Sequence, residues 1–70
     1  MNDSLGEALP KEQARVRALV LAYRDPDLRG AGEIAARMME ASLKSADEAV
    51  MSGDIAAMIL AYNDLKDFTE

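Results

Sequence analysis

The stretch "AVMSGDIAAM", residues 49–58, decides the fold of this 70-residue chain, because it joins two helix-forming patterns through a very short link. Gly53 suits the left-handed position that follows the last turn of a helix. Asp54 suits the position that caps the start of the next helix. A link this short keeps the two helices adjacent, so the sequence predicts an antiparallel helical hairpin.

Apolar residues recur at helical spacing on both sides of this link and again nearer the N-terminus. We therefore predict helices over about residues 10–24, 29–52 and 54–68. Residues 1–9 lack this period and are expected to form a flexible tail, which leaves residues 10–70 as a single helical domain. The predicted fold is an all-α, three-helix domain in which the first helix packs across the hairpin.

Three apolar faces are predicted to meet in the core. They consist of Val16, Leu19, Val20 and Tyr23 in the first helix; Ala36, Met39, Leu43, Ala46 and Val50 in the second, widened by Ala35, Met38, Ser42 and Ala49; and Ile55, Met58, Ile59, Tyr62 and Leu65 in the third. The opposite side of the second helix is charged. Its Glu33–Arg37 and Glu40–Lys44 pairs have the i,i+4 spacing of stabilising ion pairs.

The chain offers little material for a hydrophobic core. Half of its residues are apolar, but many of these are alanines, which bury little area each. Domains this small usually need a disulfide, a metal or a partner chain in addition to their core. The absence of Cys and His excludes disulfides and removes the most common transition-metal ligands. Self-association remains, and we predict a homo-oligomer, with a dimer favoured.

The first helix carries a second apolar face, formed by Ala14, Ala18, Leu21 and Ala22. A surface helix of a monomer needs only one apolar face. This helix is therefore either sandwiched between its own chain and a partner, or its alanines simply face water. The face predicted to contact another copy or an unknown protein partner comprises Val16, Leu19, Leu21, Tyr23, Met51 and Leu60. For Met51 the alternative is an isolated exposed side chain.

The net charge of −5 is concentrated in one half of the chain. Residues 1–37 hold six basic and six acidic side chains, whereas residues 38–70 hold two basic and seven acidic ones. An acidic surface repels phosphate backbones, so we predict no binding to nucleic acid. The same excess suggests an alternative function as an acidic decoy that binds and blocks a nucleic-acid-binding protein. Arg37, Lys44 and Lys66 interrupt the acidic surface that such a decoy requires.

The stretch "DPDLRGAGE", residues 25–33, begins like a calcium-binding loop, with aspartates at the first and third ligand positions. Arg29, however, stands where an oxygen ligand belongs, and Ala36 stands where a glutamate should close the site. We therefore predict no metal site. The aspartate–proline pair is instead typical of a helix boundary, and the second helix begins either at Pro26 or after Gly30.

No arrangement of residues predicts catalysis. The serines have no histidine to activate them, and the carboxylate pairs are expected on solvent-facing sides. We predict a non-enzymatic protein without cofactors. No apolar run approaches the length of a membrane span or a signal peptide, so we expect no membrane association and a cytoplasmic location.

Two resemblances extend this interpretation. Residues 46–65, "ADEAVMSGDIAAMILAYNDL", resemble the inner turn of a tetratricopeptide-type hairpin, which implies the hairpin geometry for a single unit. Residues 9–24, "LPKEQARVRALVLAYR", and residues 38–67, "MMEASLKSADEAVMSGDIAAMILAYNDLKD", resemble a group of small uncharacterised proteins encoded in phages and prophages of proteobacteria. This second resemblance implies a phage origin and a bacterial host, and it brings no functional residues. We therefore predict an accessory protein that binds other proteins.

Overall fold

The link between the second and third helices has the backbone geometry that its sequence favours. Gly53 follows helix α2 (Glu33–Ser52) in a left-handed conformation, with φ of 69°. Asp54 caps helix α3 (Ile55–Lys66), because its carboxylate accepts the N–H of Ala57 at 3.2 Å. The chain therefore turns back at this point, and the predicted hairpin is confirmed.

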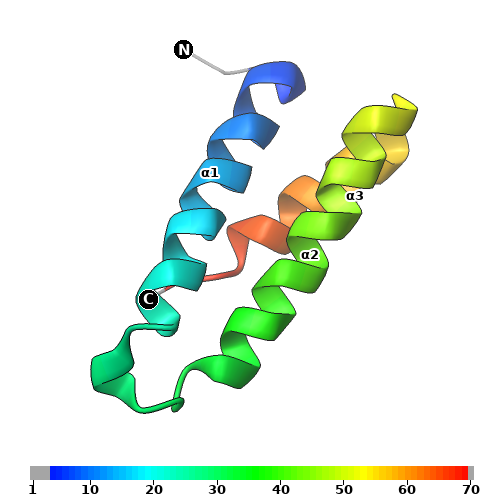
Figure 1. Cartoon of the computed structure of the whole chain (residues 1–70). Coiled ribbons are helices and arrows are strands. Elements are labelled where there is room, and N and C mark those ends of the chain that lie inside the picture. The colour runs from blue at the N-terminus through cyan, green and yellow to red at the C-terminus, as the bar shows by residue number, and fades with distance from the viewer. Residues whose placement is uncertain (1–3, 70) are drawn as a thin grey trace.

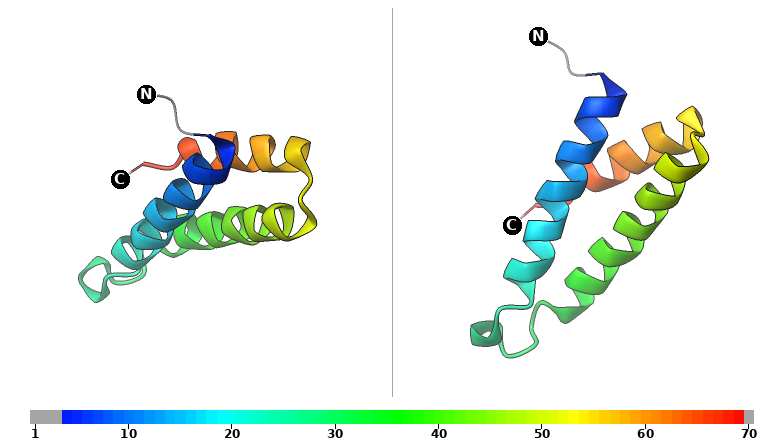
Figure 2. Two further views of the ribbon diagram at one scale, coloured as in Figure 1. Left: turned by 90° about the horizontal axis from the view of Figure 1, so that it is seen from above. Right: turned by 45° about the horizontal axis from the view of Figure 1, so that its top comes forward.

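The structure is a computed structural model that describes residues 4–69, and this part of the chain forms three α-helices and one short 3-10 turn (Figure 1). Helix α1 spans Leu5–Tyr23, and the 3-10 turn η1 spans Pro26–Leu28. α1 and α2 run side by side in opposite directions, and α3 returns from the end of α2 and crosses towards α1 (Figure 2). Each helix packs against the other two, which confirms the all-α, three-helix fold.

The core lies where the three helices face one another. Its buried side chains are Leu9, Val16, Leu19 and Val20 of α1, Ala36, Met39, Leu43 and Ala46 of α2, and Ala61 and Leu65 of α3. Arg15 holds the end of α3 against α1, because its guanidinium donates to the backbone carbonyls of Leu65 at 2.8 Å and Phe68 at 2.7 Å. Carbonyls at the C-terminal end of a helix are available for such bonds.

The first helix begins earlier than the sequence predicted. It starts at Leu5, so residues 5–9, which were assigned to a tail, are helical, and Leu9 is fully buried. Residues 1–3 of that predicted tail lie outside the described residues. Pro10, whose preference for a first helical turn suggested the later start, lies inside the helix. Burial of Leu9 in the core favours the longer helix despite the proline.

The buried faces of α2 and α3 are turned slightly from those predicted. Four residues placed in or beside the core are instead exposed: Met38, Val50, Ile55 and Ile59. Ala49 and Ala61 are buried near them. α3 crosses α2 instead of following it, and small side chains at the crossing let the two helices approach closely (Figure 2). The larger neighbours are therefore turned towards water.

The connection between α1 and α2 shows where the second helix begins. Pro26–Leu28 form only a 3-10 turn, which is capped by the Asp25 carboxylate accepting the N–H two residues later at 2.9 Å. Arg29 and Gly30 then adopt left-handed backbone conformations, with φ of 52° and 83°. These conformations end the turn, and α2 begins at Glu33. Of the two predicted starts, the later one is correct.

Candidate functional site

Half of the predicted contact face is occupied by contacts within the chain. Val16 and Leu19 are 0% and 6% exposed, because they belong to the core that α1 shares with the other helices. Their assignment to a contact face is therefore wrong. Tyr23 is half-buried, and its hydroxyl donates to the backbone carbonyl of Thr69 at 2.7 Å. It ties the last turn of α1 to the segment that follows α3.

The other three predicted residues are exposed, but on different helices. Leu21 of α1, Met51 of α2 and Leu60 of α3 are 75%, 87% and 70% exposed. Leu21 lines a groove between α1 and α2, whereas Leu60 lines a hollow between α2 and α3. The predicted face therefore corresponds to separate surfaces of the molecule.

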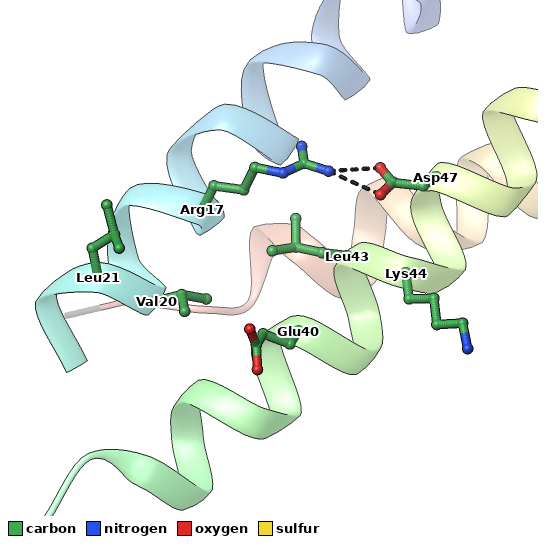
Figure 3. Close-up of a pocket in the computed structure, with 7 residues that line it drawn as sticks. All are labelled: Arg17, Val20, Leu21, Glu40, Leu43, Lys44 and Asp47. Carbon is green, nitrogen blue, oxygen red and sulfur yellow. Dashed lines mark hydrogen bonds and ion pairs between the residues drawn. The ribbon is translucent and has the colours of Figure 1, made fainter. Parts of the chain in front are cut away.

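The groove between α1 and α2 has a volume of about 490 Å³ (Figure 3). It is lined by Arg17, Val20, Leu21, Glu40, Leu43, Lys44 and Asp47. Val20 and Leu43 are core residues and give it an apolar floor. Arg17 and Asp47 reach towards each other across it from the two helices (Figure 3). Leu21 is the exposed large apolar side chain among the lining residues.

Hydrogen bonds and ion pairs join α1 to α2 at this groove. The guanidinium of Arg17 donates to both carboxylate oxygens of Asp47, at 2.8 and 2.9 Å. Gln13 donates its side-chain amide to the same carboxylate at 2.8 Å. Arg24 donates to both carboxylate oxygens of Glu40 at 2.7 and 2.8 Å. These polar groups of the groove are therefore already engaged within the chain.

Arg24 belongs to a cluster of four charged residues at the α1–α2 connection. It also donates to Glu33 at 3.2 Å, and Arg37 donates to Glu33 at 3.0 Å, so the predicted Glu33–Arg37 pair is confirmed. Glu40 was predicted to pair with the lysine one turn later, but its hydrogen bonds go to Arg24. Hydrogen bonds from Arg24 lower the pKa of Glu40 and, together with those from Arg37, lower the pKa of Glu33. Those bonds raise the pKa of Arg24, so the cluster stays charged at neutral pH.

A second apolar surface lies on the side of α2 that faces away from α1. Ile34, Met38, Ala41 and Ser45 follow i, i+4, i+7 and i+11 spacing and therefore share one face of α2. Leu60 of α3 adjoins Ser45 at a hollow of about 320 Å³. The hollow is lined by Ser45, Ala57, Leu60, Ala61 and Asp64. We call Ile34, Met38, Ala41, Ser45 and Leu60 the apolar strip.

The sequence alone does not predict this strip. Its pattern places Met38 at the edge of the core and Ile34 on no predicted face, although the two residues have helical spacing. The same helix carries a stronger apolar period, and that period forms the core. The second apolar period is weaker. Whether it marks an exposed face depends on where α3 lies, because α3 could have covered that face of α2.

Within residues 4–69, no group of three or more acidic side chains is placed to hold a metal ion, and the chain contains no His or Cys. The two carboxyl groups with lowered pKa, Glu33 and Glu40, lie in exposed ion pairs outside any enclosed cavity. None of the described helices combines the length and apolar character needed to cross a membrane. The described surfaces offer apolar contacts bordered by charges, which suit protein binding.

No protein-family model matches the chain, and no curated protein or solved structure is significantly similar to it.

Proposed function

We propose that the chain is a small, non-enzymatic accessory protein that binds other proteins and associates with itself, with a dimer favoured. The observation that carries this proposal is the exposure of large apolar side chains. Within the described residues, Leu21, Ile34, Met51 and Leu60 are each at least 70% exposed. Scattered apolar side chains are ordinary on surfaces, but groups of them bordered by polar residues are typical of protein contacts.

The small size of the core supports the same proposal. Three of its buried residues, Ala36, Ala46 and Ala61, are alanines and bury little apolar area each. Each apolar Å² removed from water stabilises a fold by about 25 cal/mol. Contact with a second copy would cover exposed apolar surface and add to what a core of this size supplies.

The resemblance to small phage and prophage proteins supports an accessory role in the cytoplasm of a bacterial host. The resemblance of residues 46–65 to a tetratricopeptide-type hairpin agrees with a protein that works through its helical surfaces. Neither resemblance assigns a partner, so the partner is inferred from the chemistry of the exposed surfaces.

The acidic decoy is the weaker alternative. A decoy for a nucleic-acid-binding protein must present carboxylates that its target can bind. Glu33, Glu40 and Asp47 are instead held by arginines of the same chain. Arg37 and Lys44 further divide the acidic groups along α2.

Sedimentation equilibrium of the purified chain at micromolar concentration tests self-association. We expect a mass that rises with concentration towards twice the 7.6 kDa of the chain. A folded, thermally stable monomer throughout that range would contradict the proposal. Circular dichroism on the same samples establishes that the chain is helical.

A further inference from the structure

We infer that the apolar strip is the surface through which two copies of the chain associate, with their α2 helices side by side and parallel. The inference rests on the proposed self-association and adds its surface and orientation. It is carried by two observations: the strip is open in the single chain, and Lys44 and Asp64 flank it with opposite charges.

The path of α3 leaves the strip open. Arg15 binds the backbone carbonyls at the end of α3 and holds that end against α1. The N-terminal half of α2 therefore has no helix over its strip side, and Ile34 and Met38 are 78% and 58% exposed. Ala41 and Ser45 lie farther along the same face. Their small side chains would let a second helix approach closely between the larger ones.

Side chains of opposite charge flank the strip. On one side, α2 carries Lys44; Arg37 on the same side is ion-paired within α2, and Glu48 follows at the far end. On the other side, Asp64 of α3 lines the hollow. Lys44 and Asp64 are both exposed. Ser45, which follows Lys44, lines the same hollow as Asp64. Lys44 and Asp64 therefore lie at the same level along the strip.

This arrangement selects one of two symmetric pairings. A twofold axis parallel to α2 places Lys44 of each copy on the same side as Asp64 of the other, at matching levels along the strip. A twofold axis across α2 makes the helices antiparallel and places the side of the strip that carries Lys44 against the same side of the other copy. Opposite charges attract and like charges repel at an interface, so the charges favour the parallel pairing.

The groove between α1 and α2 is less suited to a second copy. Its two acidic groups are already engaged: Asp47 is bound by Arg17 of α1, and Glu40 is bound by Arg24, which follows α1. Leu21 is its single strongly exposed large apolar residue among those that line it. The strip offers three large apolar side chains that are mostly exposed, Ile34, Met38 and Leu60.

Disulfide cross-linking tests the orientation, because the chain contains no Cys of its own. We expect Met38→Cys to form a disulfide with Met38→Cys of a second copy, and Ser45→Cys to do the same. Parallel helices bring each position next to its own counterpart, within the roughly 4 Å between Cβ atoms that a disulfide needs. Cross-linking only between the two different variants, when they are mixed, would overturn the parallel pairing.

Substitutions on the strip test the surface. The double variant Ile34→Gln, Met38→Gln keeps good helix formers and is expected to raise the dimer dissociation constant about tenfold or more. The matched control Ile55→Gln makes the same change at a side chain that is 60% exposed, close to the 58% of Met38, and is expected to alter that constant by less than about twofold. Circular dichroism establishes that both variants remain helical.

A charge exchange tests the pairing of Lys44 with Asp64 of the other copy. Lys44→Glu and Asp64→Lys are each expected to weaken the dimer, whereas the two together restore it, because the pair is reformed with its signs reversed. Additive weakening in the double variant would overturn this pairing.

These outcomes separate the inference from the proposed function. A wild-type chain that is monomeric contradicts the proposed function and the inference together. A wild-type dimer that is unaffected by the strip variants overturns the inference alone and leaves self-association in place. A dimer weakened equally by Ile55→Gln and by the strip variants would also count against the strip.

Discussion

Gly32 is a residue with no room for a side chain. A Cβ atom there would overlap the backbone carbonyl of Tyr23, the last residue of α1. A carbonyl of the main chain cannot move aside by rotating a side chain. Gly32 therefore lets the start of α2 pass directly against the end of α1, and it sets how closely the two helices approach.

We expect Gly32→Ala to lower the free energy of unfolding by about 1–3 kcal/mol or more, because backbone must shift to admit the methyl group. Gly6→Ala is the matched control, since the added Cβ there meets only the Ser4 hydroxyl at 3.8 Å. Gly6 lies in the first turn of α1, so its replacement should stabilise the helix by up to about 1 kcal/mol. Chemical denaturation of both variants measures the difference, and equal effects would contradict the account.

Substitution of Leu9 tests whether α1 begins as early as Leu5. It is fully buried, so Leu9→Ala should cost about 2–5 kcal/mol, enough to unfold much of a domain this small. The control Leu21→Ala removes the same atoms from a side chain that is 75% exposed and should change stability by no more than about 0.5 kcal/mol. If thermal unfolding shows Leu9→Ala to be as mild as its control, the first turns of α1 do not pack as described.

At the scale of single elements, the turn between α2 and α3 is specified by local chemistry. Gly53 takes the left-handed conformation, Asp54 caps α3, and the Ser52 hydroxyl accepts the N–H of Asp54 at 3.3 Å. Each interaction joins residues that are close in sequence. This is why the turn and the hairpin could be predicted from the sequence alone.

We expect Asp54→Ala to cost about 1 kcal/mol, because the first turn of α3 loses its side-chain acceptor. Asp54→Asn retains an oxygen in the same position and should cost much less. Urea unfolding followed by circular dichroism compares the two variants. A loss as large for Asn as for Ala would indicate that the cap does not stabilise this turn.

Other features of the elements could be predicted only in part. The spacing of Ser4 and Glu7 is that of a capping box, which could have indicated the early start of α1, but Pro10 is a stronger local signal. The structure shows no side-chain cap hydrogen bond at Ser4. Which face of α3 is buried could not be predicted from the sequence. That face depends on how Ala61 packs where α3 crosses α2.

At the scale of the whole molecule, the exposed apolar surfaces could also be predicted only in part. Leu21, Met51 and Leu60 are exposed, as contact with a partner would require, whereas Val16 and Leu19 are core residues. The helical spacing of apolar residues identifies those that share a face of a helix. It does not predict which of two apolar faces the rest of the chain will cover.

The pairing of Arg24 with Glu33 and Glu40 leads us to expect a pH-dependent stability. The pKa of each carboxyl group is lowered from 4.5 in the folded chain, so the pairing stabilises the fold above that value and is lost as pH falls through the lower folded pKa. The difference in Tm between the wild type and Arg24→Gln should therefore be largest near neutral pH and shrink below 4.5. High salt should reduce it as well, since the pairs are exposed. A difference that grows on acidification would contradict this assignment.

A second copy that covers the apolar strip would stabilise the fold. The Tm of the wild-type chain, measured from about 1 µM to about 100 µM protein, tests this, since association of folded chains makes Tm depend on concentration. We expect a Tm that rises steadily across this range, and a much flatter dependence for the Ile34→Gln, Met38→Gln double variant. A wild-type Tm that is high and constant at every concentration would contradict it.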